Sequence, residues 1–152
     1  MREDLEYVAV SPSWAEELSH FFSVLIANKD DVYYHPHPLT YDMARRIAAY
    51  EGEDLYFLQI KDNVIVGYAM LRGWDEGYAT PSLGIAMHPK FRNQGLGFKF
   101  MKFLHREARA KGATTVRVKV YQENAGARNL YGKCGYTFTA EENGQLIGHC
   151  NL

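Results

Sequence analysis

The fold is decided by residues 82–112, which read SLGIAMHPKFRNQGLGFKFMKFLHREARAKG. The apolar run at the start of this stretch predicts a strand. After the turn Phe91–Gly97, apolar residues recur at helical spacing, so Gly95 or Gly97 begins a helix that Gly112 ends. At a helix start, unpaired N–H groups and the positive end of the dipole face outward, and glycine lets a ligand approach the backbone. The stretch therefore predicts a phosphate-binding turn between a strand and a helix.

Two helices and a hairpin are expected before this stretch. Alternating residues predict a strand near the N-terminus, and the next segment predicts a helix that Ser13 and Glu16 would close as a capping box. Two prolines exclude a helix from residues 29–39, which we expect to form a loop. The expected elements are a strand at Leu5–Val10, a helix at Ser13–Asn28, the loop Lys29–Leu39, a helix at Thr40–Tyr50 and hairpin strands at Leu55–Ile60 and Val64–Leu71.

Strands and helices alternate around and after the turn. We expect a strand at Tyr78–Met87, the helix that ends near Lys111, a strand at Thr115–Tyr121, a helix at Asn124–Lys133, and strands at Tyr136–Thr139 and Gln145–Cys150 around Asn143-Gly144. The order β-α-α-β-β-β-α-β-α-β-β combines antiparallel hairpins with one β-α-β crossover. The fold class is therefore α/β (α+β), a mixed sheet with helices on its faces, in a single domain over residues 1–152.

Composition and charge exclude several classes of protein. The chain has 152 residues, of which 47% are hydrophobic, and a formal net charge of −1, so we expect neither disorder nor a global attraction to nucleic acid or membranes. No apolar run approaches the about 20 residues of a membrane-spanning helix, and the start MREDLEYVAV reads as a strand rather than a secretory signal. We therefore expect a cytoplasmic protein in which Cys134 and Cys150 are free thiols.

Two common phosphate-binding motifs fail on specific residues of the turn. A P-loop needs Gly-Lys-Ser/Thr at the helix start, but Phe98 and Lys99 follow Gly97. A dinucleotide-binding turn needs a third glycine where Phe100 stands, and a hairpin precedes the strand where a Rossmann fold would have a parallel unit. Five cations along the helix lie away from its apolar side and are interpreted as a solvated face: Lys99, Lys102, Arg106, Arg109 and Lys111.

The turn and a second segment together resemble one enzyme family. Residues 83–97 read LGIAMHPKFRNQGLG, with Arg-x-x-Gly-x-Gly after a strand that ends in Met-x-Pro, and residues 124–136 read NAGARNLYGKCGY. Both segments are similar to motifs of the GNAT N-acetyltransferases, in the same order and at the same separation. The chain resembles that family over nearly its whole length. The resemblance implies the GNAT acyl-CoA N-acyltransferase fold, with acetyl-CoA as cosubstrate.

The resemblance also implies a role for each residue of the two motifs. Backbone amides of the turn would hold the CoA pyrophosphate, and the preceding strand would pair with the pantetheine arm. Asn124 would contact the pantetheine, and Tyr131 would lie beside the thioester sulfur, where a phenol can protonate the leaving thiolate. The implied cosubstrate-binding residues are Ile85, Ala86, Met87, Arg92, Asn93, Gln94, Gly95, Leu96, Gly97, Asn124 and Tyr131. Because an amine attacks a thioester directly, we expect a ternary complex rather than an acyl-enzyme.

The general base is where this chain departs from the family pattern. Many relatives carry a carboxylate near the start of the strand before the turn, whereas this chain reads Ala79-Thr80-Pro81-Ser82. The base lies elsewhere, acts through water or is dispensable, as it would be for an α-amino group with a pKa of about 8. The candidate bases are His35, His37, Asp75 and Glu76, of which the histidines titrate near neutrality. The candidate acceptor-binding residues are Tyr33, Tyr34, His35, His37, Trp74 and Ser82.

We therefore expect an enzyme that acetylates the primary amine of a small molecule, without a metal and with neither nucleic acid nor membrane as partner. The acceptor loop resembles that of GNAT proteins linked to amino-sugar modification, which favours an amino sugar over amino acids, polyamines and protein N-termini. Two hypotheses from other classes stay open: a catalytically idle acyl-CoA-binding sensor and a nucleotide-dependent oxidoreductase. Exposed edge strands would allow a homodimer.

Overall fold

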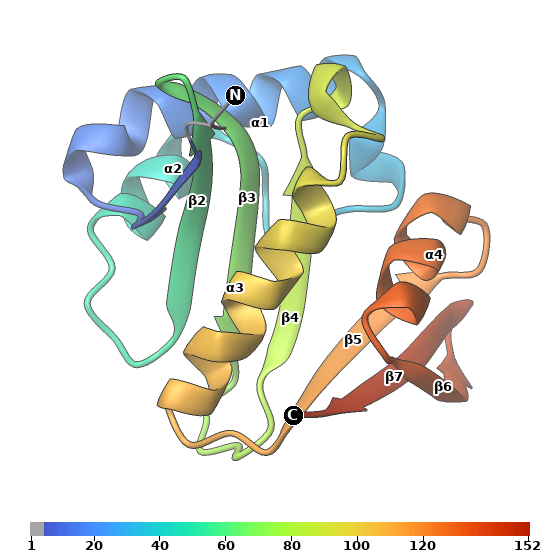
Figure 1. Ribbon diagram of the computed structural model, residues 1–152. Helices are drawn as coiled ribbons and strands as arrows, with labels where there is room; N and C mark the ends of the chain where they lie inside the picture. The colour runs from blue at the N-terminus through green and yellow to red at the C-terminus, as the bar shows by residue number, and fades with distance from the viewer. Residues whose placement is uncertain (1–4) are drawn as a thin grey trace.

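The computed structural model describes residues 5–152, in which seven strands and four α-helices form the fold (Figure 1). The strands are β1 (Leu5–Ala9), β2 (Leu55–Lys61), β3 (Val64–Arg72), β4 (Ser82–Met87), β5 (Thr115–Tyr121), β6 (Thr137–Glu142) and β7 (Gln145–Asn151). The α-helices are α1 (Ala15–Ala27), α2 (Tyr41–Ala48), α3 (Leu96–Ala110) and α4 (Ala125–Lys133), with short 3₁₀ helices η1 (Pro12–Trp14), η2 (Asp30–Val32) and η3 (Pro89–Phe91). The first four residues, part of the start that reads as a strand rather than a secretory signal, lie outside the described residues.

One sheet holds all the described strands in the order β1-β2-β3-β4-β5-β7-β6, which confirms the predicted mixed α/β fold. Neighbouring strands are antiparallel except β4 and β5, which are parallel because the crossover through α3 joins them. Among the described residues, β4 and β5 pair only at Ser82 and Arg117. Beyond this pair the two strands diverge (Figure 1), so the β4 backbone toward Met87 faces a gap in the sheet.

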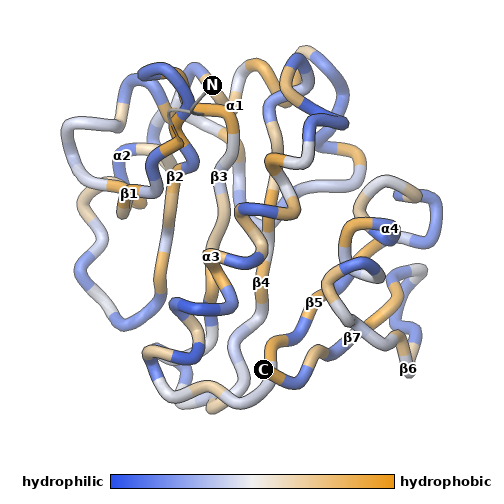
Figure 2. Tube along the Cα trace, in the orientation of Figure 1, coloured by the Kyte–Doolittle hydropathy of each residue, from blue (hydrophilic) through white to orange (hydrophobic). Residues whose placement is uncertain are grey.

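Helices bury both faces of the sheet. The face under α3 and α4 carries one core cluster, and the face under α1 and α2 carries the other. In Figure 2 the turns of α3 switch between hydrophilic blue and hydrophobic orange, as expected for a helix with one buried side. Each large side chain that becomes fully buried contributes about 1.5–3 kcal/mol. Residues that pack in the first cluster include Leu71, Leu83, Phe100, Leu104 and Val118, and those in the second include Leu18, Phe22, Ile47, Leu58 and Met70.

The structure corrects the predicted start of β4. This strand begins at Ser82 rather than at Tyr78, and residues 79–80 form a bend. Pro81 has no N–H to donate to a ladder, and its carbonyl instead accepts a hydrogen bond from the Arg117 N–H at 2.9 Å. This hydrogen bond therefore joins the chain to β5 at the residue just before β4 begins.

The structure also corrects one predicted helix cap. The capping box at Ser13 is wrong: this residue lies inside η1, its hydroxyl bonds that of Ser11 at 3.2 Å, and α1 begins without a side-chain cap. A proline at the first position of η1 favours this extra turn before α1. In contrast, the Thr40 hydroxyl accepts the Met43 N–H at 3.1 Å and caps α2, at the residue where the predicted helix begins.

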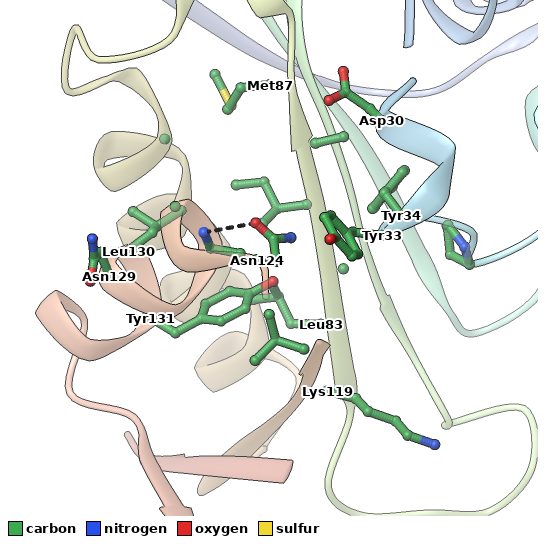
Figure 3. Close-up of a pocket in the computed structure, with 18 of the residues that line it drawn as sticks. Asp30, Tyr33, Tyr34, Leu83, Met87, Lys119, Asn124, Asn129, Leu130 and Tyr131 are labelled. Atoms are coloured by element: carbon green, nitrogen blue, oxygen red, sulfur yellow. Dashed lines mark hydrogen bonds between the residues drawn. The ribbon is translucent and has the colours of Figure 1, made fainter. Parts of the chain in front are cut away.

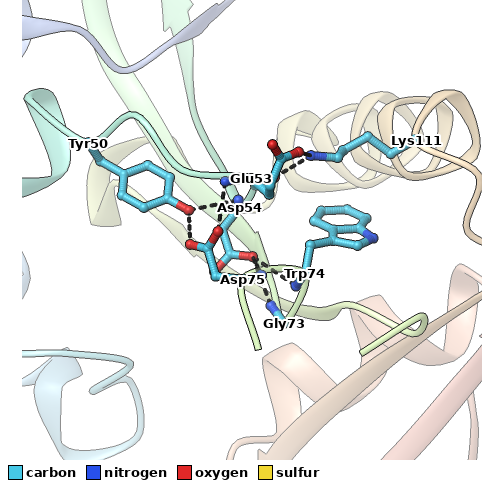
Figure 4. A network of polar contacts seen from close by, with 7 residues as sticks. All are labelled: Tyr50, Glu53, Asp54, Gly73, Trp74, Asp75 and Lys111. Carbon is cyan, nitrogen blue, oxygen red and sulfur yellow. Dashed lines mark hydrogen bonds and ion pairs between the residues drawn. The ribbon is translucent and has the colours of Figure 1, made fainter. Parts of the chain in front are cut away.

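A polar network fixes the loop between β3 and β4 (Figure 4). The Asp54 carboxylate accepts the backbone N–H groups of Gly73, Trp74 and Asp75 at 3.0, 2.9 and 3.3 Å. Charge-assisted hydrogen bonds of this kind are stronger than neutral ones. Because these residues directly follow Arg72, the network holds the end of β3 in place.

Candidate functional site

A cavity of about 920 Å³ occupies the gap between β4 and β5. Its walls come from β4, the turn before α3, β5, α4 and residues 29–36. Figure 3 shows Asn124, the residue before α4, and Tyr131 of α4 on one side of the cavity and Asp30, Tyr33 and Tyr34 on the other. The volume is in the range of small-molecule and cofactor sites, so we treat the cavity as the candidate active site.

The turn before α3 is shaped to bind an anion. Asn93 and Gly95 have left-handed backbone conformations, with φ of 62° and 77°, and both line the cavity. Left-handed residues in a tight turn gather backbone N–H groups into a concave nest, and the first N–H groups of α3 have no partner within the helix. At Gly97 an added Cβ would lie 3.4 Å from Leu130 Cδ2, so glycine permits the close packing of α3 against α4. The turn therefore fits the pyrophosphate of CoA.

Arg92 supports this turn with its side chain. The guanidinium donates to both carboxylate oxygens of Asp30, at 3.1 and 2.8 Å, and to the Met87 carbonyl at 3.1 and 2.9 Å. The same group therefore ties η2 to the end of β4. Because the protein itself engages the guanidinium, the predicted phosphate contacts rest on backbone N–H groups here.

Two residues that the sequence singled out, at the cap of α4 and within it, both line the cavity. The Asn124 side-chain oxygen accepts the Ala127 N–H at 3.3 Å, so the residue is an N-cap as well as a cavity residue. Tyr131 is only 5% exposed. Burial raises the pKa of Tyr131, and the nearby Cys134 raises it further. The phenol is therefore protonated at neutral pH and can donate a proton into the cavity.

The loop between α1 and α2 supplies the wall opposite α4. Tyr33, Tyr34 and His35 line the cavity there. The His35 ring Nε2 lies 3.0 Å from the Tyr121 hydroxyl, and the Tyr33 ring centroid lies 5.7 Å from that of Tyr121. The loop thus docks on β5 across the gap and closes one end of the cavity.

His37, the second candidate base, does not line the cavity. Its Nδ1–H donates to the Pro38 carbonyl at 2.8 Å, and its Nε2 lies 2.8 Å from the Tyr68 hydroxyl, which donates to it. A carbonyl can only accept, so the neutral ring carries its proton on Nδ1 and accepts the Tyr68 proton at Nε2. With both nitrogens engaged and the ring packed 5.4 Å from that of Phe22, the placement of His37 supports a packing role rather than proton transfer.

His37 predicts a pH dependence of stability. Burial lowers its pKa, the Pro38 carbonyl opposes this, and Arg72 adds to the lowering. Since the folded pKa lies below the unfolded one, the stabilisation is complete above the unfolded pKa and is lost as pH falls through the folded pKa. Urea unfolding should show a lower free energy of unfolding at pH 5.5 than at pH 7.5, with a smaller difference in His37→Gln. An equal difference in the variant would contradict this assignment; the exposed His149→Gln is the control.

Four further candidates lie outside the cavity. Gln94, Asp75 and Glu76 are exposed, and Trp74 lies beneath Lys111, whose Nζ is 4.7 Å from the indole centroid. The β3–β4 loop that carries the last three is held away from the gap by the Asp54 network. Leu96 has a core side chain, 1% exposed, and contributes only backbone to the turn.

Sequence reasoning missed three cations in the cavity. Arg72 of β3 pairs with Ser82 of β4, and Ser82 pairs with Arg117 of β5. Arg72, Ser82 and Arg117 therefore form one row across one face of the sheet. Lys119 follows on the same face of β5, and the row and Lys119 line the cavity. The signal was present: β5 alternates buried valines with Arg117 and Lys119. What the sequence lacked was the register that brings Arg72 beside them.

In residues 5–152, no three His, Cys, Asp or Glu side chains gather closely enough to hold a metal ion. Within the same range, none of the helices has the length and apolar character needed to cross a membrane. Cys134 and Cys150 are free thiols.

Comparisons with known proteins agree on one family. Residues 11–136 match the model of the acetyltransferase (GNAT) family. The L-methionine sulfoximine/L-methionine sulfone acetyltransferase of Salmonella typhimurium is 29% identical over 109 residues, which cover 67% of this chain and 64% of that protein. The L-amino acid N-acyltransferase MnaT of Escherichia coli is 28% identical over 109 residues, or 67% of this chain and 63% of that protein. The chain thus aligns with just under two thirds of the length of these relatives.

A solved structure shows the same fold. The PaiA N-acetyltransferase of Thermoplasma acidophilum, in complex with coenzyme A, superposes with a TM-score of 0.80 over 98% of this chain and 99% of that chain. The two sequences are 13% identical, so the likeness concerns the fold.

Proposed function

Because the chain belongs to the acetyltransferase (GNAT) family, whose model matches residues 11–136, we propose that it transfers the acetyl group of acetyl-CoA to the α-amino group of a small amino acid. The observation that carries this proposal is the cavity through the β4–β5 gap, which joins an anion-binding turn at one end to a row of cations at the other. The first end suits CoA and the second suits an acceptor with a carboxylate.

The cosubstrate side rests on backbone groups. The nest at Asn93 and Gly95 would take the pyrophosphate, and the unpaired edge of β4 at Ile85–Met87 would pair with the amide groups of the pantetheine arm. Asn124 lies on the opposite wall within reach of the same arm. This arrangement leads the thioester toward Tyr131.

The transfer itself needs one proton donor. The neutral amine attacks the thioester carbonyl carbon, the C–S bond breaks, and the thiolate takes the Tyr131 proton. The nitrogen loses one proton to a base or to solvent, and Tyr131 regains one from solvent, so the reaction has no net proton change. A phenol is protonated at neutral pH, as a general acid requires, and burial of Tyr131 raises its pKa further. Of the predicted bases, His35 lines the cavity, which supports it as an acceptor of the amine proton. An α-amino group, with a pKa of about 8, is partly neutral without such help.

The acceptor side rests on side-chain charge. Arg72 and Arg117 flank Ser82 in the row across the sheet, and a guanidinium binds a carboxylate through two parallel hydrogen bonds. The named activities of the two relatives, on L-methionine sulfoximine or sulfone and on L-amino acids, support the same acceptor class. An amino sugar, favoured by the loop resemblance, offers no carboxylate to this row and is therefore the competing acceptor.

Thiol release from acetyl-CoA tests the proposal with matched acceptors. We expect kcat/KM for L-methionine to exceed that for methioninamide and for 3-(methylthio)propylamine by about 10- to 100-fold, because each loses the carboxylate. Amino sugars and peptides with free N-termini belong in the same panel. A stronger response to an amino sugar would replace the acceptor class, and acetyl-CoA binding without turnover for any amine would support the sensor hypothesis.

A further inference from the structure

The Tyr34 hydroxyl is buried without a hydrogen-bond partner. Among the described residues, only two buried side-chain polar atoms share this condition, the Tyr34 hydroxyl and Gln59 Oε1. The Gln59 side chain lies in the core, where its amide nitrogen donates to the Leu96 carbonyl at 2.9 Å. Tyr34, in contrast, lines the cavity. Because an unpaired buried hydroxyl is unfavourable, its presence at a binding cavity calls for a ligand that completes it.

Tyr34 lines the cavity that also holds the residues proposed to bind the carboxylate and the thioester. It packs with the cluster on the α1 and α2 face of the sheet, whereas Tyr131 belongs to the cluster on the α3 and α4 face. Tyr34, Tyr131 and Arg72 nevertheless line the same cavity, where Figure 3 shows the two tyrosines on opposite sides. The Tyr34 hydroxyl therefore belongs to the same cavity as the cation that would bind the carboxylate and the phenol that would protonate the sulfur.

The position of the attacking nitrogen follows from these two anchors. In an α-amino acid one carbon separates the carboxylate from the amine. If the carboxylate lies on Arg72 and the thioester sulfur lies beside Tyr131, the nitrogen lies between them, in the cavity that Tyr34 also lines. We infer that Tyr34 is an acceptor-binding catalytic residue whose hydroxyl oxygen accepts a hydrogen bond from the amine N–H. This contact turns the nitrogen lone pair toward the thioester carbonyl carbon.

Tyr34 orients the amine and does not serve as the general base that removes the amine proton. Burial raises the pKa of Tyr34, and the neighbouring Tyr131 raises it further, while Arg72 lowers it. The phenol therefore stays protonated at neutral pH and keeps an oxygen lone pair for the amine. Orientation by a fixed neutral group fits a site whose cavity wall at the start of β4 offers Ser82 rather than a carboxylate.

Tyr34→Phe tests this inference, which rests on the proposed function. The substitution removes only the hydroxyl and keeps the ring. We expect kcat/KM for the amino acid to fall about 10- to 30-fold, while the KM for acetyl-CoA stays within about twofold. The melting temperature should be unchanged or rise by about 1–3 °C, because an unpaired buried hydroxyl is removed. Tyr78→Phe is the matched control, since Tyr78 is 62% exposed and lies outside the cavity.

The outcomes separate this inference from the proposed function. A fall in turnover with an unchanged or higher melting temperature supports the amine contact. The loss of a hydroxyl with a structural role would lower the turnover and the melting temperature together. Unchanged kinetics in Tyr34→Phe with an active wild type would overturn the inference alone, as would a loss of turnover that parallels a fall in melting temperature. A wild type without turnover on any amine would overturn the proposed function, and the inference with it.

Discussion

Tyr131→Phe is expected to lower kcat about 100- to 1,000-fold, the largest effect of any single substitution that we predict. The variant keeps the ring that packs in the core but has no proton for the thiolate, and a positioned general acid contributes a factor of this size. The dissociation constant for CoA should stay within about twofold, since the proposed CoA contacts lie in the turn and on β4. Stopped-flow thiol release and calorimetric titration with CoA measure the two quantities separately.

A fall in CoA affinity to match the fall in kcat would show that Tyr131 binds the cosubstrate rather than serving as an acid. The acceptor provides a further control, because amines of different pKa should lose similar factors if the missing proton goes to sulfur. Unchanged kcat would remove the assignment of Tyr131 as the acid. The mutation leaves Tyr136 in place, whose ring centroid lies 5.5 Å away, so large repacking is not expected.

Arg72→Met is expected to reduce kcat/KM for an amino acid about 100-fold, through the acceptor KM. The substitution keeps an unbranched apolar chain at the end of β3 and removes the guanidinium that would bind the carboxylate. The same variant should act on 3-(methylthio)propylamine within about threefold of the wild type, because that amine has no carboxylate to lose. The kinetics of both substrates, measured on one protein preparation, check this expectation.

Arg72→Lys provides the graded comparison. Lysine restores the charge but not the two parallel donors, so we expect an intermediate loss. An equal loss for the amino acid and for the amine would instead indicate a displaced acceptor loop, because the Arg72 guanidinium also donates to the Pro36 carbonyl at 3.2 Å.

The fold could be predicted from local signals because those signals agree with one another. Gly95 serves as the N-cap of α3 with a left-handed φ, and Asn143 and Gly144 turn between β6 and β7 with positive φ, as their residue types indicate. Predictions failed where a neighbour in sequence competed. At Ser13 the proline before it favours a 3₁₀ turn, and before Ser82 the proline delays β4.

The candidate site could be predicted only in part, because its two halves are encoded differently. The glycine turn and the α4 segment are each contiguous in sequence, so their residues could be found by reading along the chain. The acceptor half is assembled from β3, β5 and the α1–α2 loop, and its members meet only through strand register. Arg72 and Arg117 are 45 positions apart in the sequence. They come together because Ser82 pairs with Arg72 on one side and with Arg117 on the other. His37, which reads like a base, is instead paired with Tyr68.

The nest at the start of α3 also bears on how such a protein diverges. Its proposed contacts come from peptide N–H groups, which every residue except proline carries, so mutations at exposed positions such as Gln94 leave them in place. The acceptor end depends on particular side chains, and a single change at Arg72 would alter which amines are accepted. Changes at exposed positions can therefore accumulate while the donor half persists and new acceptor preferences arise at the other end.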